Sequence, residues 1–107
     1  MARTPIHPGE ILADELNEID ISAADLARKL EVPANRISQI LAGKRAITAD
    51  SALRLGRYFG TSPEFWMNLQ RAYDLDLARQ QLGTALKRIP QRPAAGVPVA
   101  GRGLKSA

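Results

Sequence analysis

The chain has 107 residues and a mass of 11.6 kDa, which suits one compact domain with a single modest hydrophobic core and argues against two domains. Apolar residues make up 45% and charged residues 24%, a composition that excludes a collagenous or wholly disordered chain. The formal net charge of +4 and the sequence pI near 10.0 raise the question of a nucleic-acid or acidic-protein partner.

Individual residue types narrow the chemistry further. The chain has no Cys, which excludes a disulfide framework, a thiolate zinc site and a cysteine nucleophile, and its one histidine, His7, excludes the common His-pair metal sites. Residues 1–10 contain prolines and an acid before any apolar run, so we expect no secretory signal there. No stretch approaches the roughly 18 consecutive apolar residues of a membrane helix. We therefore expect a cytoplasmic protein with no cofactor, no metal, no membrane contact and no small-molecule substrate.

The first predicted helix opens at Pro8, because proline is favoured in the first helical turn. Its apolar positions recur near the helical period: Ile11, Leu12, Leu16 and Ile19. Acids occupy other positions: Glu10, Asp14, Glu15 and Glu18. The pattern predicts an amphipathic helix with an acidic face, and it favours a capping role for His7 over a catalytic one.

Two short helices follow in close succession. Ser22 is a helix cap with Asp25 in the first turn, and the helix that it opens ends near residues 31–32. Pro33 begins the next helix, which ends at Gly43, a residue suited to the left-handed C-terminal position. The apolar positions of the first of these helices are Leu26, Ala27 and Leu30.

Two more helices are predicted before the sequence changes character. Thr48 caps a fourth helix that ends at Gly60, and residues 62–64 supply a serine cap, a first-turn proline and a first-turn acid for a fifth. The fifth helix runs to Gln81, with Gly83 beyond it. Since no alternating β pattern of useful length occurs, we predict an all-α fold of five helices without a sheet.

The texture of the sequence changes at Thr84. From there to the end, prolines and glycines recur among small residues, with five basic residues and no acid. We therefore divide the chain into a folded unit, residues 1–83, and a basic Pro/Gly-rich tail, residues 84–107. The tail is expected to be disordered apart from a few helical residues around 85–89.

The stretch from Ser22 to Arg45 carries the functional signal. Two short helices joined by a turn of three or four residues, and followed by more helices, are typical of a helix-turn-helix. At about 100° per residue, the buried side of the second helix consists of Ile37, Ile40 and Leu41. The opposite side consists of Asn35, Gln39 and Ala42, with Arg36 and Ser38 on the flanks.

These side chains suit the major groove of DNA. The amides of Asn35 and Gln39 pair with adenine N6 and N7, and Arg36 pairs with guanine O6 and N7 or holds a phosphate. Lys44 and Arg45 follow the helix, within reach of a phosphate, and groups near the Ser22 cap suit another phosphate. The predicted DNA-binding residues are Ser22, Asn35, Arg36, Ser38, Gln39, Lys44 and Arg45. The alternative is an ordinary solvated face, with Lys44 and Arg45 complementing the helix dipole.

The charge distribution agrees with this assignment better than the total charge does. Residues 1–27 have a net charge of −5, residues 28–57 of +5, residues 58–83 of −1 and residues 84–107 of +5. The high pI therefore comes from the tail, because the first 83 residues together carry −1. The positive block at residues 28–57 coincides with the predicted DNA-facing helices.

Several longer runs form a more specific pattern, which spans about residues 5–82. They are His7–Leu12, Leu26–Ser38, Gly43–Thr48, Ala52–Leu55, Trp66–Gln70 and Tyr73–Leu75. In this order the runs resemble the HigA antitoxin family, also called VapI-type, within the lambda-repressor-like group of helix-turn-helix proteins. The chain departs from the family at Glu31 and Pro33, where many relatives have glycine and a hydroxyl cap. A non-glycine residue in a left-handed turn costs about 1 kcal/mol.

The resemblance implies an all-α homodimer that represses its own toxin-antitoxin operon by binding operator DNA. It also implies a HigB-like toxin partner, an mRNA-cleaving ribonuclease. Large apolar side chains at helical spacing on the fifth helix are predicted to form core or dimer contacts: Phe65, Trp66, Leu69 and Tyr73. The acidic face of the first helix is a hypothetical toxin-binding surface or simply a solvated face: Glu10, Asp14, Glu15 and Glu18.

Two other functions remain in view. A stand-alone helix-turn-helix transcriptional regulator without a toxin partner is the alternative, and the sequence barely separates it from an antitoxin. A small basic ribonuclease or RNA-binding effector is disfavoured, because acid–base cleavage needs converging groups and the carboxylates here fall on a repetitive helix face. We therefore predict no enzymatic activity.

Overall fold

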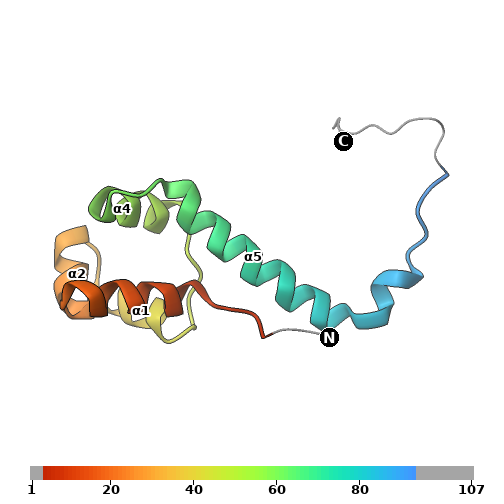
Figure 1. Cartoon of the computed structure of the whole chain (residues 1–107), viewed down its shortest axis with the longest axis horizontal. Helices are drawn as coiled ribbons and strands as arrows, with labels where there is room; N and C mark the ends of the chain where they lie inside the picture. The colour runs from red at the N-terminus through yellow and green to blue at the C-terminus, as the bar shows by residue number, and fades with distance from the viewer. Residues whose placement is uncertain (1–3, 94–107) are drawn as a thin grey trace.

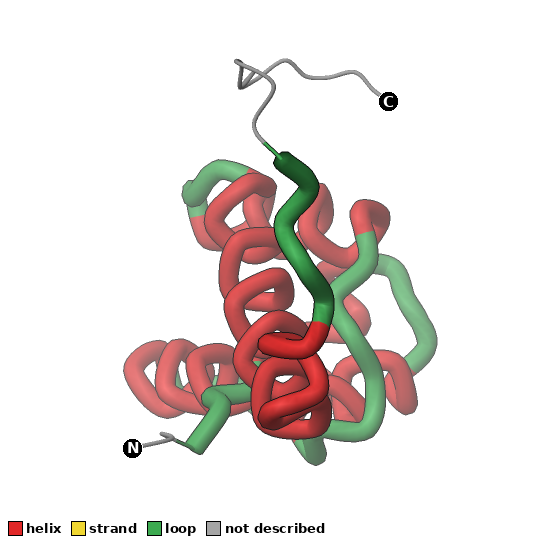
Figure 2. Tube along the Cα trace, turned by 90° about the vertical axis from the view of Figure 1, so that its right-hand side faces the viewer, coloured by secondary structure: helices red, strands yellow, loops and turns green. Residues whose placement is uncertain are grey.

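The computed structural model describes residues 4–93, which form five α-helices and one short 3-10 helix (Figure 1). The elements are α1 (Pro8–Ile19), α2 (Ala23–Leu30), α3 (Ala34–Leu41), α4 (Ala49–Phe59), α5 (Pro63–Leu82) and η1 (Gly83–Arg88). Helices and loops account for the whole described range, with no strand in it (Figure 2). The predicted all-α class and its five helices are confirmed.

The helix starts follow the caps that the sequence predicts. Ser22 Oγ accepts a hydrogen bond from the Asp25 N–H at 3.1 Å, and Ser62 Oγ accepts one from the Phe65 N–H, also at 3.1 Å. Thr48 makes the same contact at the start of α4, where its Oγ1 accepts a hydrogen bond from the Ser51 N–H at 3.3 Å. Each side-chain oxygen satisfies one of the backbone donors that a helix start leaves unpaired.

His7 is the cap of α1. Its Nδ1 accepts a hydrogen bond from the Gly9 N–H at 2.9 Å, and the Glu10 carboxylate accepts one from the His7 N–H at 3.3 Å, which completes a capping box. The imidazole is buried and lies edge-on to the Tyr73 ring of α5, with centroids 4.8 Å apart. Burial lowers the pKa of His7, and the nearby carboxylates of Glu10 and Asp74 partly oppose that shift. The capping role predicted for His7 is confirmed.

The lowered pKa of His7 predicts a loss of stability in acid. Below about pH 6.5 the unfolded chain binds a proton on this imidazole, whereas the folded chain does not until the pH reaches its lower pKa. The contribution of His7 to the free energy of unfolding is therefore complete above about pH 6.5 and falls as the pH drops toward the folded pKa. His7→Ser keeps a capping oxygen that does not titrate. Urea unfolding of both proteins between pH 7.5 and 5.0 should show a smaller pH dependence for the variant; equal slopes would contradict the assignment.

The turn between α2 and α3 contains a residue in the left-handed region. Glu31 has φ 60° and ψ 46°, and the following Val32 N–H donates to the Ala27 carbonyl at 3.0 Å. Pro33 then occupies the N-cap of α3 and makes no side-chain cap hydrogen bond. The predicted start of this helix at Pro33 is therefore one residue early, because proline's fixed φ fits the extended cap as well as the first helical turn.

Glu31→Gly is expected to raise the free energy of unfolding by about 1 kcal/mol, because glycine lacks the Cβ that strains a left-handed residue. Glu31→Ala is the matched control, since it removes the same carboxylate and keeps the strained backbone. Chemical denaturation should place the alanine variant close to the unmodified chain. Equal stabilisation by both substitutions would assign the gain to the lost charge and not to the turn.

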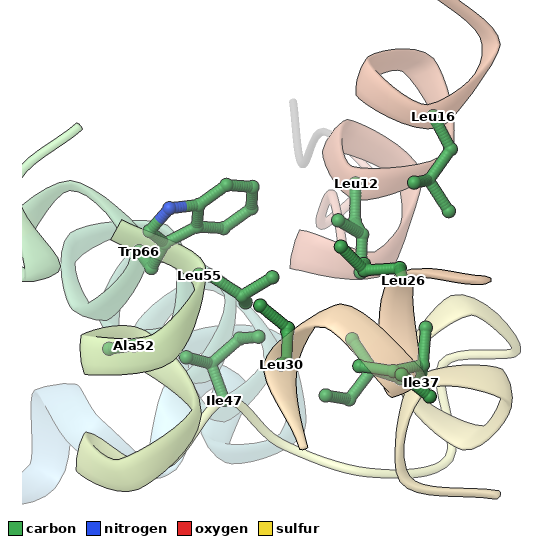
Figure 3. Packing of buried hydrophobic residues seen from close by; sticks show 11 residues of the cluster. Leu12, Leu16, Leu26, Leu30, Ile37, Ile47, Ala52, Leu55 and Trp66 are labelled. Atoms are coloured by element: carbon green, nitrogen blue, oxygen red, sulfur yellow. The ribbon is translucent and has the colours of Figure 1, made fainter. Parts of the chain in front are cut away.

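One hydrophobic core joins α1, α2, α3, α4 and the first half of α5. Its buried apolar members are Leu12, Leu16, Leu26, Ala27, Leu30, Ile37, Ile40, Ile47, Ala52, Leu55 and Trp66. Figure 3 shows Leu30 of α2 and Leu55 of α4 pointing toward each other in this cluster. Trp66 has no exposed surface, and its indole N–H donates to Thr61 Oγ1 at 2.9 Å, so the largest core residue is also hydrogen-bonded.

The second half of α5 leads away from the other helices (Figure 1). The buried residues of this helix, Trp66 and Gln70, both lie in its first half. The helix ends at Leu82, one residue beyond the prediction, and η1 covers most of the few helical residues expected at 85–89. Residues 89–93 of the predicted tail are not helical, and residues 94–107 lie outside the described residues. Within the described range, no helix is both long and apolar enough to cross a membrane.

Candidate DNA-binding surface

The two helices of the predicted helix-turn-helix, α2 and α3, pack on each other; α3 also packs on α1, and α2 is connected to α4. Arg54 of α4 makes this connection, because its Nη1 donates to the Leu30 carbonyl at the end of α2 at 2.7 Å. The same guanidinium reaches the Glu31 carbonyl at 3.5 Å and donates through Nε to Asp50 at 3.0 Å. Arg54 therefore caps α2 and fixes the turn that sets the angle of α3.

The exposure of α3 follows its predicted faces. Ile37 and Ile40 are buried and Leu41 is half-buried, whereas the opposite side is open to solvent. Along that side the exposed residues are Asn35, Ser38 and Ala42, and the half-exposed residues are Arg36 and Gln39. We call these five residues the α3 face. They include amides, a hydroxyl and a guanidinium, which are the groups that hydrogen-bond to base edges in the major groove.

Asn35 and Ser38 differ in the side-chain hydrogen-bonding groups that remain available for a contact with DNA. Ser38 Oγ donates to the Asn35 backbone carbonyl at 3.3 Å, so its hydroxyl proton is used within the helix. The Asn35 side-chain amide makes no hydrogen bond to any other described residue. Asn35 therefore presents both a donor and an acceptor on the α3 face.

Arg36 has a protein partner that its helical position did not reveal. Its guanidinium forms a hydrogen-bonded ion pair with Asp50, fourteen residues away at the start of α4. The hydrogen bond from Arg36, and to a smaller extent the one from Arg54, lowers the pKa of Asp50, so this carboxylate stays ionised. In this structure Arg36 joins α3 to α4, and a DNA contact by Arg36 requires sharing or releasing Asp50.

Lys44 and Arg45 follow a tight turn after α3. Gly43 has φ 76°, and the Lys44 N–H donates to the Gln39 carbonyl at 2.8 Å, so the chain folds back beside the helix. Arg45 Nε then donates to Gln39 Oε1 at 2.8 Å. The exposed Lys44 side chain makes no ion pair within residues 4–93. The two cations therefore lie at the C-terminal edge of the α3 face.

Ser22 lies at the other end of the helix-turn-helix, exposed at the start of α2. Its hydroxyl oxygen caps Asp25, which itself pairs with Arg28. The N–H groups of Ala23 and Ala24 have no carbonyl partner within the helix, which is the usual arrangement for binding a phosphate at a helix start. The seven predicted DNA-binding residues thus belong to α3, the turn after it and the start of α2.

Sequence reasoning missed three residues that support this surface: Asp50, Arg54 and Gln70. Gln70 is buried, accepts the Ile47 N–H at 2.7 Å and donates to Asp74 Oδ1 at 2.9 Å, which fixes the loop before α4 against α5. The i, i+4 spacing of Asp50 and Arg54 would have indicated their pairing. Helical periodicity does not distinguish the buried Gln70 from the exposed polar residues around it, although Gln70 ends the Trp66–Gln70 run of the family pattern.

The residues predicted for a dimer interface separate into two groups. Trp66 is wholly buried among α4, α5 and the Thr61 hydroxyl, so it belongs to the core and leaves no surface for a second subunit. Phe65 is 39% exposed, and Leu69 and Tyr73 are half-exposed. Leu69 and Tyr73 line a hollow of about 190 Å³ with Ile6, Ile11, Ala72 and Asp76.

The acids of α1 lie mostly on its outer surface. Asp14 and Glu18 are exposed and Glu15 is half-exposed, whereas the exposed Glu10 also serves the capping box with His7. Across residues 4–93, no three His, Asp or Glu side chains come together in a way that could hold a metal ion. The α1 acids thus form an open negative surface on a different helix from the α3 face.

The fold and this surface define a helix-turn-helix protein, and the family profile described as helix-turn-helix matches residues 12–66. Virulence-associated protein I of Dichelobacter nodosus is 53% identical over 76 residues, 70% of each chain. A HigA-family addiction module antidote protein from Coxiella burnetii superposes with a TM-score of 0.82 and 51% identity, covering 85% of this chain and all of that one. Pseudomonas aeruginosa antitoxin HigA, solved with the higBA promoter, gives 0.78 and 52%, covering 82% and 97%. The chain belongs to the HigA (VapI-type) family of helix-turn-helix antitoxins.

Proposed function

We propose that the chain is the antitoxin of a type II toxin-antitoxin module. In this role it binds operator DNA as a homodimer, represses its own operon and neutralises a HigB-like mRNA-cleaving toxin. The observation that carries the proposal is the open polar α3 face beside Lys44 and Arg45, on a domain that closely resembles an antitoxin solved with promoter DNA. We assign DNA binding and dimerisation to residues 1–83.

DNA binding is supported by the position of the charges as well as by the α3 face. The positive block of residues 28–57 falls on the end of α2, α3, the turn after α3 and most of α4, whereas the negative block of residues 1–27 falls on α1 and the start of α2. Phosphates are therefore attracted to the side of the domain that carries the amides. Phosphate contacts orient the domain, and the α3 face reads the bases.

A homodimer is supported by the geometry of operators and by the apolar surface of α5. Helix-turn-helix dimers hold their recognition helices about 34 Å apart, so that they meet two half-sites one turn apart. Leu69 lies in the hollow between α1 and α5 and offers apolar surface for a subunit contact. Leu69→Asp is expected to yield monomers, as measured by sedimentation equilibrium, since an unpaired charge in an apolar contact is costly. A variant that remains dimeric would exclude Leu69 from the interface.

A toxin contact is proposed for the outer acids of α1. Asp14, Glu15 and Glu18 are available there, and a basic ribonuclease is a complementary partner for them. Reversal of these three charges should weaken toxin binding and reduce its dependence on salt. Unchanged affinity and salt dependence would move the toxin contact to another surface.

The test of the whole proposal uses the full chain and its neighbouring gene. Co-expression with the adjacent open reading frame should yield a stable complex, and either the complex or the chain alone should shift the shared promoter in a gel. Operator binding without a co-purifying toxin would favour the stand-alone regulator. Failure to bind the promoter as well would contradict both functions.

A further inference from the structure

The turn after α3 brings an arginine beside Gln39, at the C-terminal edge of the α3 face. The left-handed Gly43 and the hydrogen bond from the Lys44 N–H to the Gln39 carbonyl reverse the chain at this point. Arg45 then lies beside Gln39, with Nε 2.8 Å from Oε1. Gln39 is the residue that helical periodicity places opposite the buried side, yet it is only half-exposed.

This hydrogen bond changes what Gln39 offers to a base. A glutamine that reads adenine uses its carbonyl oxygen to accept from N6 and its amide to donate to N7. Here the carbonyl oxygen already accepts from Arg45 with one of its two lone pairs, so the amide N–H groups are the part of the Gln39 side chain that has no partner in the described residues. The unpartnered polar groups of the pair are therefore N–H donors, whereas a single glutamine would present a donor and a fully available acceptor.

The hydrogen bond also determines which edge of the guanidinium is available. Nε is occupied by Gln39, which leaves the N–H groups of the two terminal nitrogens of Arg45 available. Neither of them has a hydrogen-bond or ion-pair partner in the described part of the chain. Two parallel N–H donors match the O6 and N7 acceptors of guanine, and they do not match the N6 donor of adenine.

We propose that Gln39 and Arg45 act as one base-reading unit that selects guanine over adenine at one position of each operator half-site. The inference rests on the proposed operator binding, and it replaces the separate roles that the sequence predicts, adenine for Gln39 and phosphate for Arg45. Lys44 lacks such a side-chain partner and keeps the phosphate role. Arg45 is thus a specificity-determining residue held in place by Gln39.

The experiment selects DNA from a random pool with the full chain and with three variants: Arg45→Ala, Gln39→Ala and Lys44→Ala. The unmodified chain should require guanine at one position. Arg45→Ala frees the Gln39 carbonyl, so the preference at that position should move from guanine to adenine, with at least about a tenfold loss of affinity for the guanine sequence. Gln39→Ala should weaken the guanine preference without creating an adenine preference. Lys44→Ala, the matched control, should weaken all sequences equally.

A second arm tests the contact atom directly. Replacing that guanine by 7-deazaguanine removes the N7 acceptor, so it should weaken binding of the unmodified chain and leave Arg45→Ala unaffected. A uniform loss of affinity in Arg45→Ala, with the base preference retained, would make Arg45 a phosphate contact and overturn the inference. Absence of any sequence-selective binding by the unmodified chain would instead overturn the proposed function, and the inference with it.

Discussion

Gly9→Ala is expected to lower the free energy of unfolding by at least about 3 kcal/mol, because it forces a side chain into the backbone of α3. A Cβ on Gly9 would lie 2.0 Å from the Ile40 carbonyl oxygen and 2.9 Å from its carbon. Backbone atoms cannot rotate away as a flexible side chain can, so α1 must move off α3 and open the core around Leu12. Alanine normally stabilises a helix relative to glycine, so the clash reverses the usual sign of the substitution.

Thermal unfolding measures this effect, because about 3 kcal/mol corresponds to a fall of roughly 12–24 °C in Tm for a domain of this size. Gly60→Ala is the matched control. Gly60 has φ 74° and no atom within 4 Å of an added Cβ, so that variant meets backbone strain without a clash. It should lose only about 1 kcal/mol. A Gly9→Ala variant as stable as the control would mean that α1 and α3 are not packed this closely.

Asn35→Ala is expected to weaken operator binding about tenfold or more while the fold stays intact. The Asn35 amide is exposed and makes no hydrogen bond to a described residue, so its loss costs the folded chain little. In a major groove, by contrast, the same amide pairs with adenine, and a good bidentate pair contributes about 1–3 kcal/mol of discrimination. The loss should be concentrated at one base position in each half-site.

Fluorescence anisotropy with operator variants and a salt titration distinguishes this loss from a general weakening. Asn35→Ala should change the base preference and leave the salt slope unchanged. Lys44→Ala should do the reverse, since a phosphate contact adds affinity for every sequence and its removal reduces the salt slope by about 1. If Asn35→Ala weakened matched and mismatched DNA equally, Asn35 would not read a base.

Much of the fold could be predicted because its signals are local. The caps at His7, Ser22, Thr48 and Ser62 act within three residues, so reading the chain in order finds the helix starts. The start of α3 was off by one residue at Pro33, since a helix start preceded by a proline cap looks the same in sequence as one that begins with proline. The faces of α3 were predicted correctly because periodicity alone determines them.

The sequence predicted which helix faces form the candidate site, but it did not predict which side chains pair with each other. The separation of Arg36 from Asp50 is fourteen residues, and Arg54 bonds to a carbonyl twenty-four residues away. Trp66 illustrates the same limit, because helical spacing identifies an apolar position without saying whether it meets the core or another subunit. These outcomes depend on how helices pack, and no short window of sequence contains that information.

The sequence by itself determined the five helices, their caps and the polar face of α3, because each depends on residues less than about two turns apart. The tertiary structure alone decided which of those polar groups are already engaged. It paired Arg36 with Asp50, buried Gln70 against the Ile47 N–H and placed Arg45 on Gln39. The physical reason is that a hydrogen-bonding group on a helix surface can bond to any complementary group that packing brings near it. In the base-reading unit that we propose, the turn after α3 therefore matters as much as the identity of Gln39, because the turn brings Arg45 to the Gln39 carbonyl oxygen.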